Sequence, residues 1–433
     1  MTDELLDRHR AVMPAWMPVY YGGDALEIVS GSGRRVTDAS GKTYLDFFGG
    51  VLTTMIGYDI PEIREAVQEQ LRTGVAHTST LYLIRRQIEL AEKIARVSGI
   101  PDARVFFTNS GSEANEAALL FATNVRRSNQ ILAIKNSYHG RTFATMAITG
   151  HRSWSASSLS PVQVSWLPSG ERLRGRMAGL TDADHIEAAV SELRETLATV
   201  TAGDVAALIA EPIQGVGGFV HAPDGLLGAL KKELDEHGIL LIADEVQTGW
   251  GRTGDHFWGY QAHDVTPDLI TFAKGIGNGF ALGGVVGRAD VMNAVPAISF
   301  STFGGNPVSC AAGNAVLDYV LDHDLQENAR RVGAILLDGL RELAATSPIV
   351  AEVRGRGLMI GVEFTRPGTG EPDVAATLRV FDECRAGGLL VGKGGLHNNV
   401  LRMGPPLTLT EAEAREGLEI LTAAVRTAQA EAI

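Results

Sequence analysis

Between about residues 100 and 300, short apolar runs alternate with segments of helical period. Six runs rich in Ile, Val, Leu and Ala have strand length: "RVFFTNS", "QILAIKNS", "VAALIAEP", "GILLIADEV", "DLITFAKG" and "LGGVVGR". "SEANEAALLFATNVRR" and "HIEAAVSELRETL" carry apolar residues at helical spacing. Such alternation predicts an α/β fold with a mostly parallel sheet and helices on both faces.

Both ends of the chain predict a smaller α+β domain. The last 125 or so residues begin with a long helical stretch, continue with the hairpin-like "VAEVRGRGLMIGVEF", and end with helix, strand and helix. Near the amino terminus, "GGDALEIVSGSGRRVTDASGKTYLDFF" predicts a meander of strands that joins them. We therefore expect residues 1–60 and 309–433 to form a small domain and residues 61–308 to form a large one.

Composition narrows the class of protein. A length of 433 residues favours two lobes, and 45% hydrophobic with 21% charged residues describes a soluble globular chain. A net charge of -13 argues against nucleic acid or an anionic membrane surface as the main partner. Two cysteines, Cys310 and Cys384, without metal-ligand spacing fit a reducing cytoplasm. We expect no secretory signal and no membrane span, because no long apolar run occurs.

Polar residues follow the strand-like runs where the strands of a parallel sheet end. These residues are Asn109, Glu211, Asp244 and Lys274. Lys274, one of only seven lysines, is followed by three glycines in "DLITFAKGIGNGF". It is either a surface lysine in a loose loop or a cleft lysine whose pKa falls through desolvation, so that its amine attacks a carbonyl. Its clustering with the other polar residues favours the cleft.

A strand, a tight turn and a helix are predicted in "FFTNSGSEANEAALLFATNVRR". Ser110, Gly111 and Ser112 fall at the helix amino terminus, where free N–H groups and the dipole favour an anion. Ser112 can instead be an ordinary N-cap with Glu116 nearby. Together with the other polar residues, the pattern favours a phosphate site.

Two acids, Asp244 and Glu245, directly follow a buried strand, so only one of them can face a ligand at the strand end. Paired acids can bind a metal, but no histidine cluster and no HExxH pattern accompany them. The alternative is an aspartate beside a pyridine nitrogen, which keeps the ring protonated as an electron sink. Tyr138 in "NSYHGRT" offers an aromatic ring for stacking, although a tyrosine there is also common in cores and interfaces.

Arg402 lies after an apolar run and before two prolines in "VLRMGPPLTLT", which suits bidentate binding of a carboxylate. Glu211 lies at a strand end in "AALIAEPIQGVGG" and would neutralise Arg402 when no diacid is bound. An ordinary interdomain salt bridge explains the pair nearly as well. The stretch "GGLLVGKGG" is not a phosphate-binding P-loop, because Gly394 rather than Ser or Thr follows Lys393.

From "YLDFFGGV" to "LRMGPPLTLT", nearly the whole chain resembles the class III aminotransferases, above all their alanine–glyoxylate subgroup. The most specific stretch is "LLIADEVQTGWGRTGDHFWGYQAHDVTPDLITFAKGIGNGF". The resemblance implies fold type I, with a mostly parallel, seven-stranded sheet in the large domain. It also implies the cofactor pyridoxal 5'-phosphate (PLP) and a homodimer, possibly a tetramer. One departure is Tyr58, which stands in "IGYDIPEI" where relatives commonly have histidine.

The resemblance also implies the roles of individual residues. Lys274 resembles the lysine that forms a Schiff base with the cofactor and later carries a proton. Asp244 resembles the partner of the ring nitrogen. The remaining cofactor residues by resemblance are Gly111 and Ser112 at the phosphate, Tyr138 and Val246 on the ring faces, His139 beside Tyr138, Gln247 at the phenolic oxygen, and Thr302 at the phosphate of a neighbouring subunit. Glu211 and Arg402 resemble a pair that lets one pocket accept both substrates.

The leading hypothesis is a ping-pong aminotransferase. Its donor would be an amine, an ω- or β-amino acid or alanine, and its acceptor pyruvate, glyoxylate or 2-oxoglutarate. One alternative is a PLP-dependent phospholyase that acts on an amino-alcohol phosphate. Another is a non-catalytic PLP-fold binding protein, against which the joint presence of Lys274, Asp244 and Arg402 argues.

Overall fold

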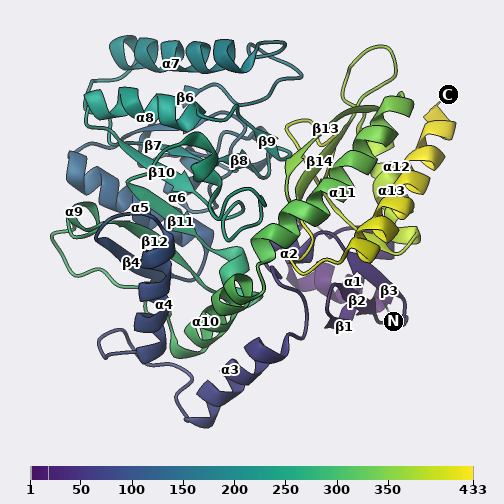
Figure 1. The fold of residues 1–433 in the computed structure, drawn as a ribbon, viewed down its shortest axis with the longest axis horizontal. Coiled ribbons are helices and arrows are strands. Elements are labelled where there is room, and N and C mark those ends of the chain that lie inside the picture. The colour runs from purple at the N-terminus through teal and green to yellow at the C-terminus, as the bar shows by residue number, and fades with distance from the viewer. Residues whose placement is uncertain (1, 18, 433) are drawn as a thin grey trace.

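A seven-stranded sheet forms the centre of the larger of two lobes (Figure 1). The computed structural model describes residues 2–17 and 19–432. In spatial order the strands are β4 (Ala103–Thr108), β12 (Gly283–Arg288), β11 (Leu269–Phe272), β10 (Leu240–Asp244), β7 (Ala207–Ala210), β5 (Gln130–Ile134) and β6 (Gln163–Leu167). Only β12 runs antiparallel to its neighbours. The prediction of a mostly parallel, seven-stranded sheet is confirmed.

The strand that the apolar pattern missed is β6 at the edge of this sheet. Its residues are exposed or half-buried except the last, Leu167. By contrast, the central strands β7, β10 and β11 are buried at every position. An edge strand is covered less fully, so "QVSWL" does not stand out as an apolar run.

Helices cover both faces of the sheet. On one face, α5 (Gly111–Arg126) packs with Ile131 and Ile209. On the other, α7 (Asp182–Thr199) and α8 (Leu226–Glu236) pack with the neighbouring residues Leu132 and Leu208. Consecutive strand residues therefore belong to different apolar clusters, as the twofold period of a strand requires.

Two four-stranded sheets form the smaller lobe. The first contains β1 (Ile28–Ser32), β2 (Arg35–Asp38), β3 (Thr43–Asp46) and β15 (Leu389–Leu390), and the second contains β13 (Val350–Arg356), β14 (Met359–Phe364), β17 (Val400–Met403) and β16 (Gly392–Gly394). The predicted meander and hairpin are both present as antiparallel pairs. Because β15 pairs with β3, strands from both ends of the chain share one sheet.

The long helical stretch of the carboxyl-terminal third is two helices, α10 (Pro307–Asp322) and α11 (Leu325–Thr346). Asp324 separates them with a left-handed φ of 49°. α10 packs on α3 (Pro61–Arg72) and α4 (Arg85–Val97) of the larger lobe, whereas α11 packs on β13 of the smaller one. The division at residues 60 and 308 stays a prediction, and we propose that its second boundary lies after α10.

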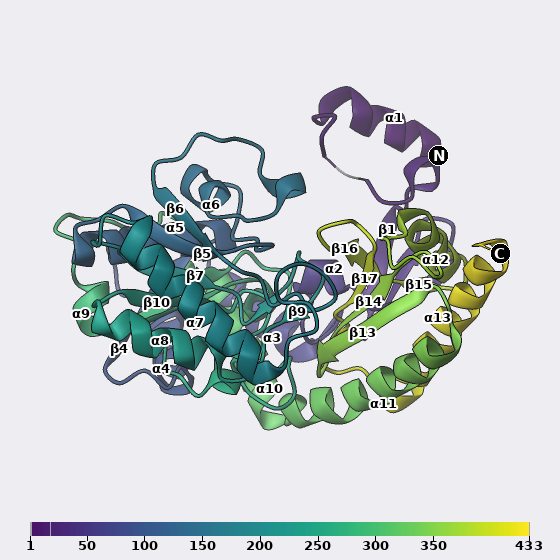
Figure 2. The same cartoon turned by 90° about the horizontal axis from the view of Figure 1, so that it is seen from above.

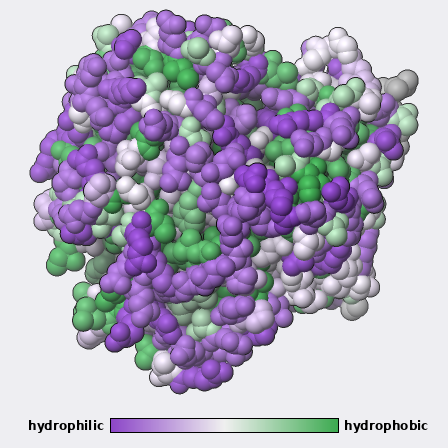
Figure 3. Space-filling view, in the orientation of Figure 1, coloured by the Kyte–Doolittle hydropathy of each residue, from purple (hydrophilic) through white to green (hydrophobic). Residues whose placement is uncertain are grey.

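The shorter and peripheral elements complete the chain. They are α1 (Thr2–Val12), η1 (Gly22–Asp24), α2 (Gly49–Leu52), α6 (Phe143–Ala147), η2 (Arg152–Trp154), β8 (Ile213–Gln214), β9 (Val220–His221), η3 (Gly259–His263), η4 (Lys274–Gly277), α9 (Ala289–Met292), α12 (Val374–Ala386) and α13 (Glu411–Ala432). Figure 2 shows α1 standing away from both lobes. Hydrophilic residues cover most of the face in Figure 3. Among the described helices, none is long and apolar enough to cross a membrane.

Candidate active site

A cavity lies at the carboxyl ends of the central strands. Eleven residues line it: Gly111, Ser112, Asn115, Tyr138, His139, Gly140, Glu211, Asp244, Val246, Gln247 and Lys274. Nine of these were candidates from the sequence. They come from five different segments, which the parallel strand ends bring to one edge of the sheet.

Asp244 is the last residue of β10 and is buried. Its Oδ2 accepts a hydrogen bond from Asn115 Nδ2 at 2.8 Å and lies 2.8 Å from His139 Nδ1. Its Oδ1 accepts the Val246 N–H at 3.1 Å. These contacts fix the orientation of the carboxylate at the cavity wall.

The neighbouring acid, Glu245, points away from the cavity. Its carboxylate accepts hydrogen bonds from the Thr248 hydroxyl at 2.5 Å and from the Gly259 and Tyr260 N–H groups at 2.9 and 2.7 Å. Burial raises the pKa of Glu245 to about 7. The expected alternation of the two acids is therefore observed. Within residues 2–17 and 19–432, no cluster of three or more His, Cys, Asp or Glu side chains could hold a metal ion.

Lys274 begins η4 directly after β11, with a left-handed φ of 49°. Burial lowers the pKa of its ammonium, and the negative charges of Asp244 and Glu211 oppose that shift. Gly275 follows because a Cβ there would lie 2.6 Å from Met55 Sδ. Gly275 thus serves close packing, whereas Gly279 has a positive φ of 101°.

The helix α5 presents its amino terminus to the cavity. The alternative that Ser112 is the N-cap is wrong, because Ser110 caps the helix and its Oγ accepts the Glu113 N–H at 3.2 Å. Ser112 Oγ instead accepts the Arg141 N–H at 3.2 Å. A Cβ on Gly111 would lie 3.1 Å from Val246 Cγ1, so glycine keeps the space in front of the helix open.

Tyr138 follows β5 and is half-buried at the cavity. Its N–H donates to Glu211 Oε1 at 2.8 Å, and its ring meets Trp154 edge to face at 5.3 Å between centroids. Burial raises the pKa of the Tyr138 hydroxyl. The tyrosine therefore faces the cavity with its ring held by a second aromatic side chain.

Glu211 and Arg402 are both buried, but within the described chain they form no ion pair with each other. Glu211 Oε2 accepts the Gly215 N–H at 2.8 Å. Arg402 Nη1 donates to the Gly215 carbonyl at 3.1 Å, and its Nε donates to the Lys393 carbonyl at 3.2 Å. The interdomain salt bridge considered from the sequence is therefore replaced by hydrogen bonds of both side chains with the backbone of Gly215.

Burial shifts the pKa values of these two side chains in opposite directions. It raises the pKa of Glu211 to about 7, and the charge of His139 opposes this shift. Burial lowers the pKa of Arg402. The guanidinium of Arg402 lies 5.6 Å from the ring centroids of both Phe48 and Phe219. Arg402 does not line the cavity itself, and Gly215 lies between it and Glu211.

Thr302 is another sequence candidate that lies outside this arrangement. It is exposed in the segment before α10 and does not line the cavity. Phe303 beside it contacts His77, with ring centroids 4.8 Å apart. Within one chain the structure therefore does not bring Thr302 together with the other candidates.

Sequence reasoning missed two lining residues, Asn115 and Gly140. Asn115 is a buried amide on the core face of α5 and donates to both Asp244 and the His139 carbonyl. A polar residue among alanines in "SEANEAA" was the available signal. Gly140 has a φ of 140°, and a Cβ there would lie 2.6 Å from Ser112 Oγ.

The cavity suits a ligand with three distinct groups. The α5 amino terminus suits an anion, the desolvated amine of Lys274 suits an aldehyde, and the Asp244 carboxylate suits a protonated ring nitrogen. Two buried atoms, Gln247 Oε1 and His139 Nε2, have no partner in the described part of the chain and remain open to a ligand. PLP combines the phosphate, the aldehyde and the pyridine nitrogen, so the residues fit it.

Comparisons with known proteins agree with this chemistry. A family model described as aminotransferase class-III matches residues 20–425. The mitochondrial alanine–glyoxylate aminotransferase 2 homolog 2 of Arabidopsis thaliana is 41% identical over 394 residues, covering 90% of this chain and 80% of that protein. The human mitochondrial alanine–glyoxylate aminotransferase 2 is 33% identical over 448 residues, covering 98% and 86%.

A solved structure extends the likeness to the fold. An amine transaminase from an uncultivated Pseudomonas species, solved in its PLP-bound form, is 31% identical with a TM-score of 0.88. The match covers 98% of each chain. Both lobes of the fold are therefore shared. The chain belongs to the class III aminotransferases, PLP-dependent enzymes of fold type I.

Proposed function

We propose that this aminotransferase moves an amino group from a small amine or amino acid to a 2-oxo acid, with Lys274 as its catalytic lysine. The observation that carries the proposal is a half-buried lysine, with a lowered pKa, in one cavity with a fixed carboxylate and a helix amino terminus. A lowered pKa makes the neutral amine more available, and both attack on a carbonyl and proton transfer require that form.

Bound PLP supplies an aldehyde and a protonated ring that accepts negative charge from the substrate carbon. We infer that Asp244 keeps the ring nitrogen protonated, since Asn115 and His139 hold its carboxylate. Gly111 and Ser112 bind the phosphate through the α5 amino terminus. Tyr138, Val246 and Gln247, with His139, make up the rest of the cofactor site.

Lys274 carries the proton in this proposal. Its Nζ would take the proton from the substrate carbon and deliver it to the reacting carbon of the cofactor. Desolvation favours the neutral form of Nζ, and the charges of Asp244 and Glu211 oppose that shift. The neutral form is the one that accepts a proton.

Arg402 is the proposed carboxylate group of the substrate site. Two of its N–H groups bond the Gly215 and Lys393 carbonyls, and charge-assisted hydrogen bonds to a carboxylate suit the others. Glu211 contacts the N–H of Gly215. Its negative charge offsets the positive charge of Arg402 when the bound amine has no carboxylate. We propose an amine, an ω- or β-amino acid or alanine as donor, and pyruvate, glyoxylate or 2-oxoglutarate as acceptor.

A homodimer, or a tetramer built from it, would complete the site. Ile298 is 92% exposed and Phe303 58% exposed in the segment that also carries Thr302. Exposed apolar side chains of this kind are typical of an interface. We propose that Thr302 reaches the phosphate held by a partner subunit. A cytoplasmic location stays a prediction from composition, and the two named relatives are mitochondrial.

A panel of donors and acceptors tests the proposal. The PLP-loaded enzyme is incubated with each donor, with and without pyruvate, glyoxylate or 2-oxoglutarate, and the amino product and ammonia are measured. An aminotransferase forms the amino product in equal amount to the donor consumed and needs the 2-oxo acid. Release of ammonia and phosphate from an amino-alcohol phosphate without any 2-oxo acid would instead establish the phospholyase.

A further inference from the structure

Arg354 and Arg402 lie in one row across three neighbouring strands of the smaller lobe. Arg354 on β13 is opposite Gly361 on β14, and Gly361 is opposite Arg402 on β17. Directly opposed residues of antiparallel strands project from the same face of a sheet. The two arginines therefore rise from one face, with no side chain between them.

The turn that joins β8 to β9 packs onto this row. Arg402 Nη1 donates to the Gly215 carbonyl at 3.1 Å, and Arg354 Nε donates to the Gly218 carbonyl at 2.8 Å. A Cβ on Gly361 would lie 2.8 Å from the Gly218 oxygen. Each arginine thus holds one end of the turn, and the glycine between them lets the turn approach the sheet.

The same turn organises the substrate side of the cavity. The Gly215 N–H binds Glu211 Oε2 at 2.8 Å. A Cβ on Gly215 would lie 2.3 Å from Gln247 Nε2, so Gly215 also packs directly on Gln247. A shift of the turn would therefore displace the environment of three candidate site residues at once.

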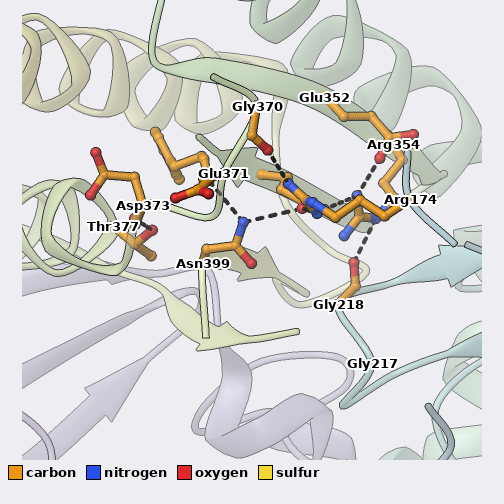
Figure 4. A network of polar contacts seen from close by, with 12 residues as sticks. Arg174, Gly217, Gly218, Glu352, Arg354, Gly370, Glu371, Asp373, Thr377 and Asn399 are labelled. Atoms are coloured by element: carbon orange, nitrogen blue, oxygen red, sulfur yellow. Dashed lines mark hydrogen bonds and ion pairs between the residues drawn. The ribbon is translucent and has the colours of Figure 1, made fainter. Parts of the chain in front are cut away.

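Arg354 is itself fixed by a buried network of charges (Figure 4). Its Nη1 binds Glu352 and, at 2.7 Å, Glu363 Oε2. Glu363 also binds Arg174 and accepts a hydrogen bond from Asn399 Nδ2 at 3.1 Å. Figure 4 shows the Arg354 side chain between Glu352 and the Gly218 carbonyl. The guanidinium therefore has little freedom to leave the turn.

We propose that Arg354 is a positioning residue for substrate carboxylates, acting through the Gly215–Gly218 turn on Arg402 and Glu211. Arg354 touches neither cofactor nor substrate in this account. It holds the turn so that Gly215 presents its carbonyl to Arg402 and its N–H to Glu211. The inference rests on the proposed role of Arg402 in binding carboxylates.

The test compares variants of the PLP-loaded enzyme by their affinity for a non-reacting dicarboxylate, glutarate, measured as an inhibition constant. For Arg354→Gln we expect the inhibition constant to rise about 10-fold or more, the effect of one weakened charge-assisted hydrogen bond. The PLP dissociation constant should stay within about twofold. A matched control is Arg174→Gln in the same network, since Arg174 binds Glu363 and the Gly370 carbonyl but not the turn.

Gly361→Ala is a second, independent variant. It keeps both arginines and adds one methyl group against the Gly218 carbonyl. We expect the same loss of glutarate affinity with unchanged PLP affinity. If Arg354→Gln does not fold, because it leaves Glu363 without one of its arginine partners, this variant alone decides the question.

Three outcomes would overturn the inference. The first is that Arg354→Gln binds glutarate as tightly as the wild type does. The second is that Gly361→Ala does so. The third is that Arg174→Gln loses as much glutarate affinity as Arg354→Gln. The last result would mean that the whole interlobe network matters rather than the turn.

Arg402→Gln separates this inference from the proposed function. If Arg402→Gln binds glutarate as the wild type does, the carboxylate site itself is wrong, whereas a loss confined to that variant refutes the role of Arg354 alone.

Discussion

Glu211 and Arg402 are joined through the backbone of one residue, Gly215: Glu211 Oε2 accepts its N–H at 2.8 Å and Arg402 Nη1 donates to its carbonyl at 3.1 Å. Gly215 has no side chain to separate the two groups. Both side chains are buried, and the charge of Glu211 opposes the lowering of the Arg402 pKa by burial. The pair can respond to a substrate carboxylate without first breaking a direct salt bridge.

The raised pKa of Glu211 predicts a pH-dependent cost in stability. The folded chain keeps this proton up to about pH 7, whereas an ordinary glutamate releases it near 4.5. Rising pH across that window therefore favours the unfolded chain, and the cost is complete above pH 7. We expect Glu211→Gln to gain up to roughly 3 kcal/mol relative to the wild type between pH 4.5 and 8.

Denaturant unfolding of both proteins at pH 5 and pH 8 measures this difference. Other buried groups, such as Glu245, titrate in both proteins and cancel in the comparison. A stability difference that does not change with pH would show that Glu211 keeps an ordinary pKa in the folded chain.

Replacement of Lys274 by alanine should remove both covalent attachment of the cofactor and proton transfer. We expect kcat/KM for transamination to fall by about 10³-fold or more, the usual share of a positioned acid–base group. Borohydride reduction followed by mass spectrometry should find labelled Lys274 in the wild type and no label in the variant. Lys135→Ala is the matched control, because Lys135 also follows a strand but is exposed and lies outside the cavity. A label that persists in Lys274→Ala would assign the role to another lysine.

Asn115→Ala tests a residue that supports Asp244. The amide donates to Asp244 Oδ2, so its loss leaves His139 as the side-chain partner of that oxygen and the carboxylate less well oriented. We expect kcat to fall roughly 10-fold, as is typical when a supporting hydrogen bond is removed. The control is Asn124→Ala on the same helix, since Asn124 Nδ2 bonds only the Leu120 carbonyl of its own helix. Equal activity of the two variants would exclude a supporting role for Asn115.

The proposed dimer predicts that a charged interface yields a monomer. Sedimentation of the wild type should give at least twice the chain mass of 46.1 kDa. The double variant Ile298→Asp with Phe303→Asp should sediment as a single chain and bind PLP about 10-fold more weakly, because Thr302 no longer reaches a partner. The control is Val200→Asp, because Val200 is also an exposed apolar residue but lies at the end of α7. A wild-type monomer with full activity would contradict the shared site.

Much of the site follows from local pattern. Asp244 and Lys274 stand at the ends of apolar runs, and a parallel sheet brings such ends to one edge whatever the loops between them do. Asn115 was missed because a buried amide inside a helix carries no local mark of its partner. That partner, Asp244, is 129 residues away in the chain.

The sequence by itself determined the alternation of strands and helices, the two-lobed plan and the chemical groups at the strand ends, because these depend on periodicity and residue type. Only the tertiary structure decided that Ser110 rather than Ser112 caps α5, that β6 forms one edge of the sheet, and that Glu211 and Arg402 both contact the backbone of Gly215 instead of forming a salt bridge. Arg354, Gly361 and Arg402 meet the Gly215–Gly218 turn from more than 100 residues away. Such contacts depend on how two lobes pack, and no pattern within a single segment of chain encodes that packing.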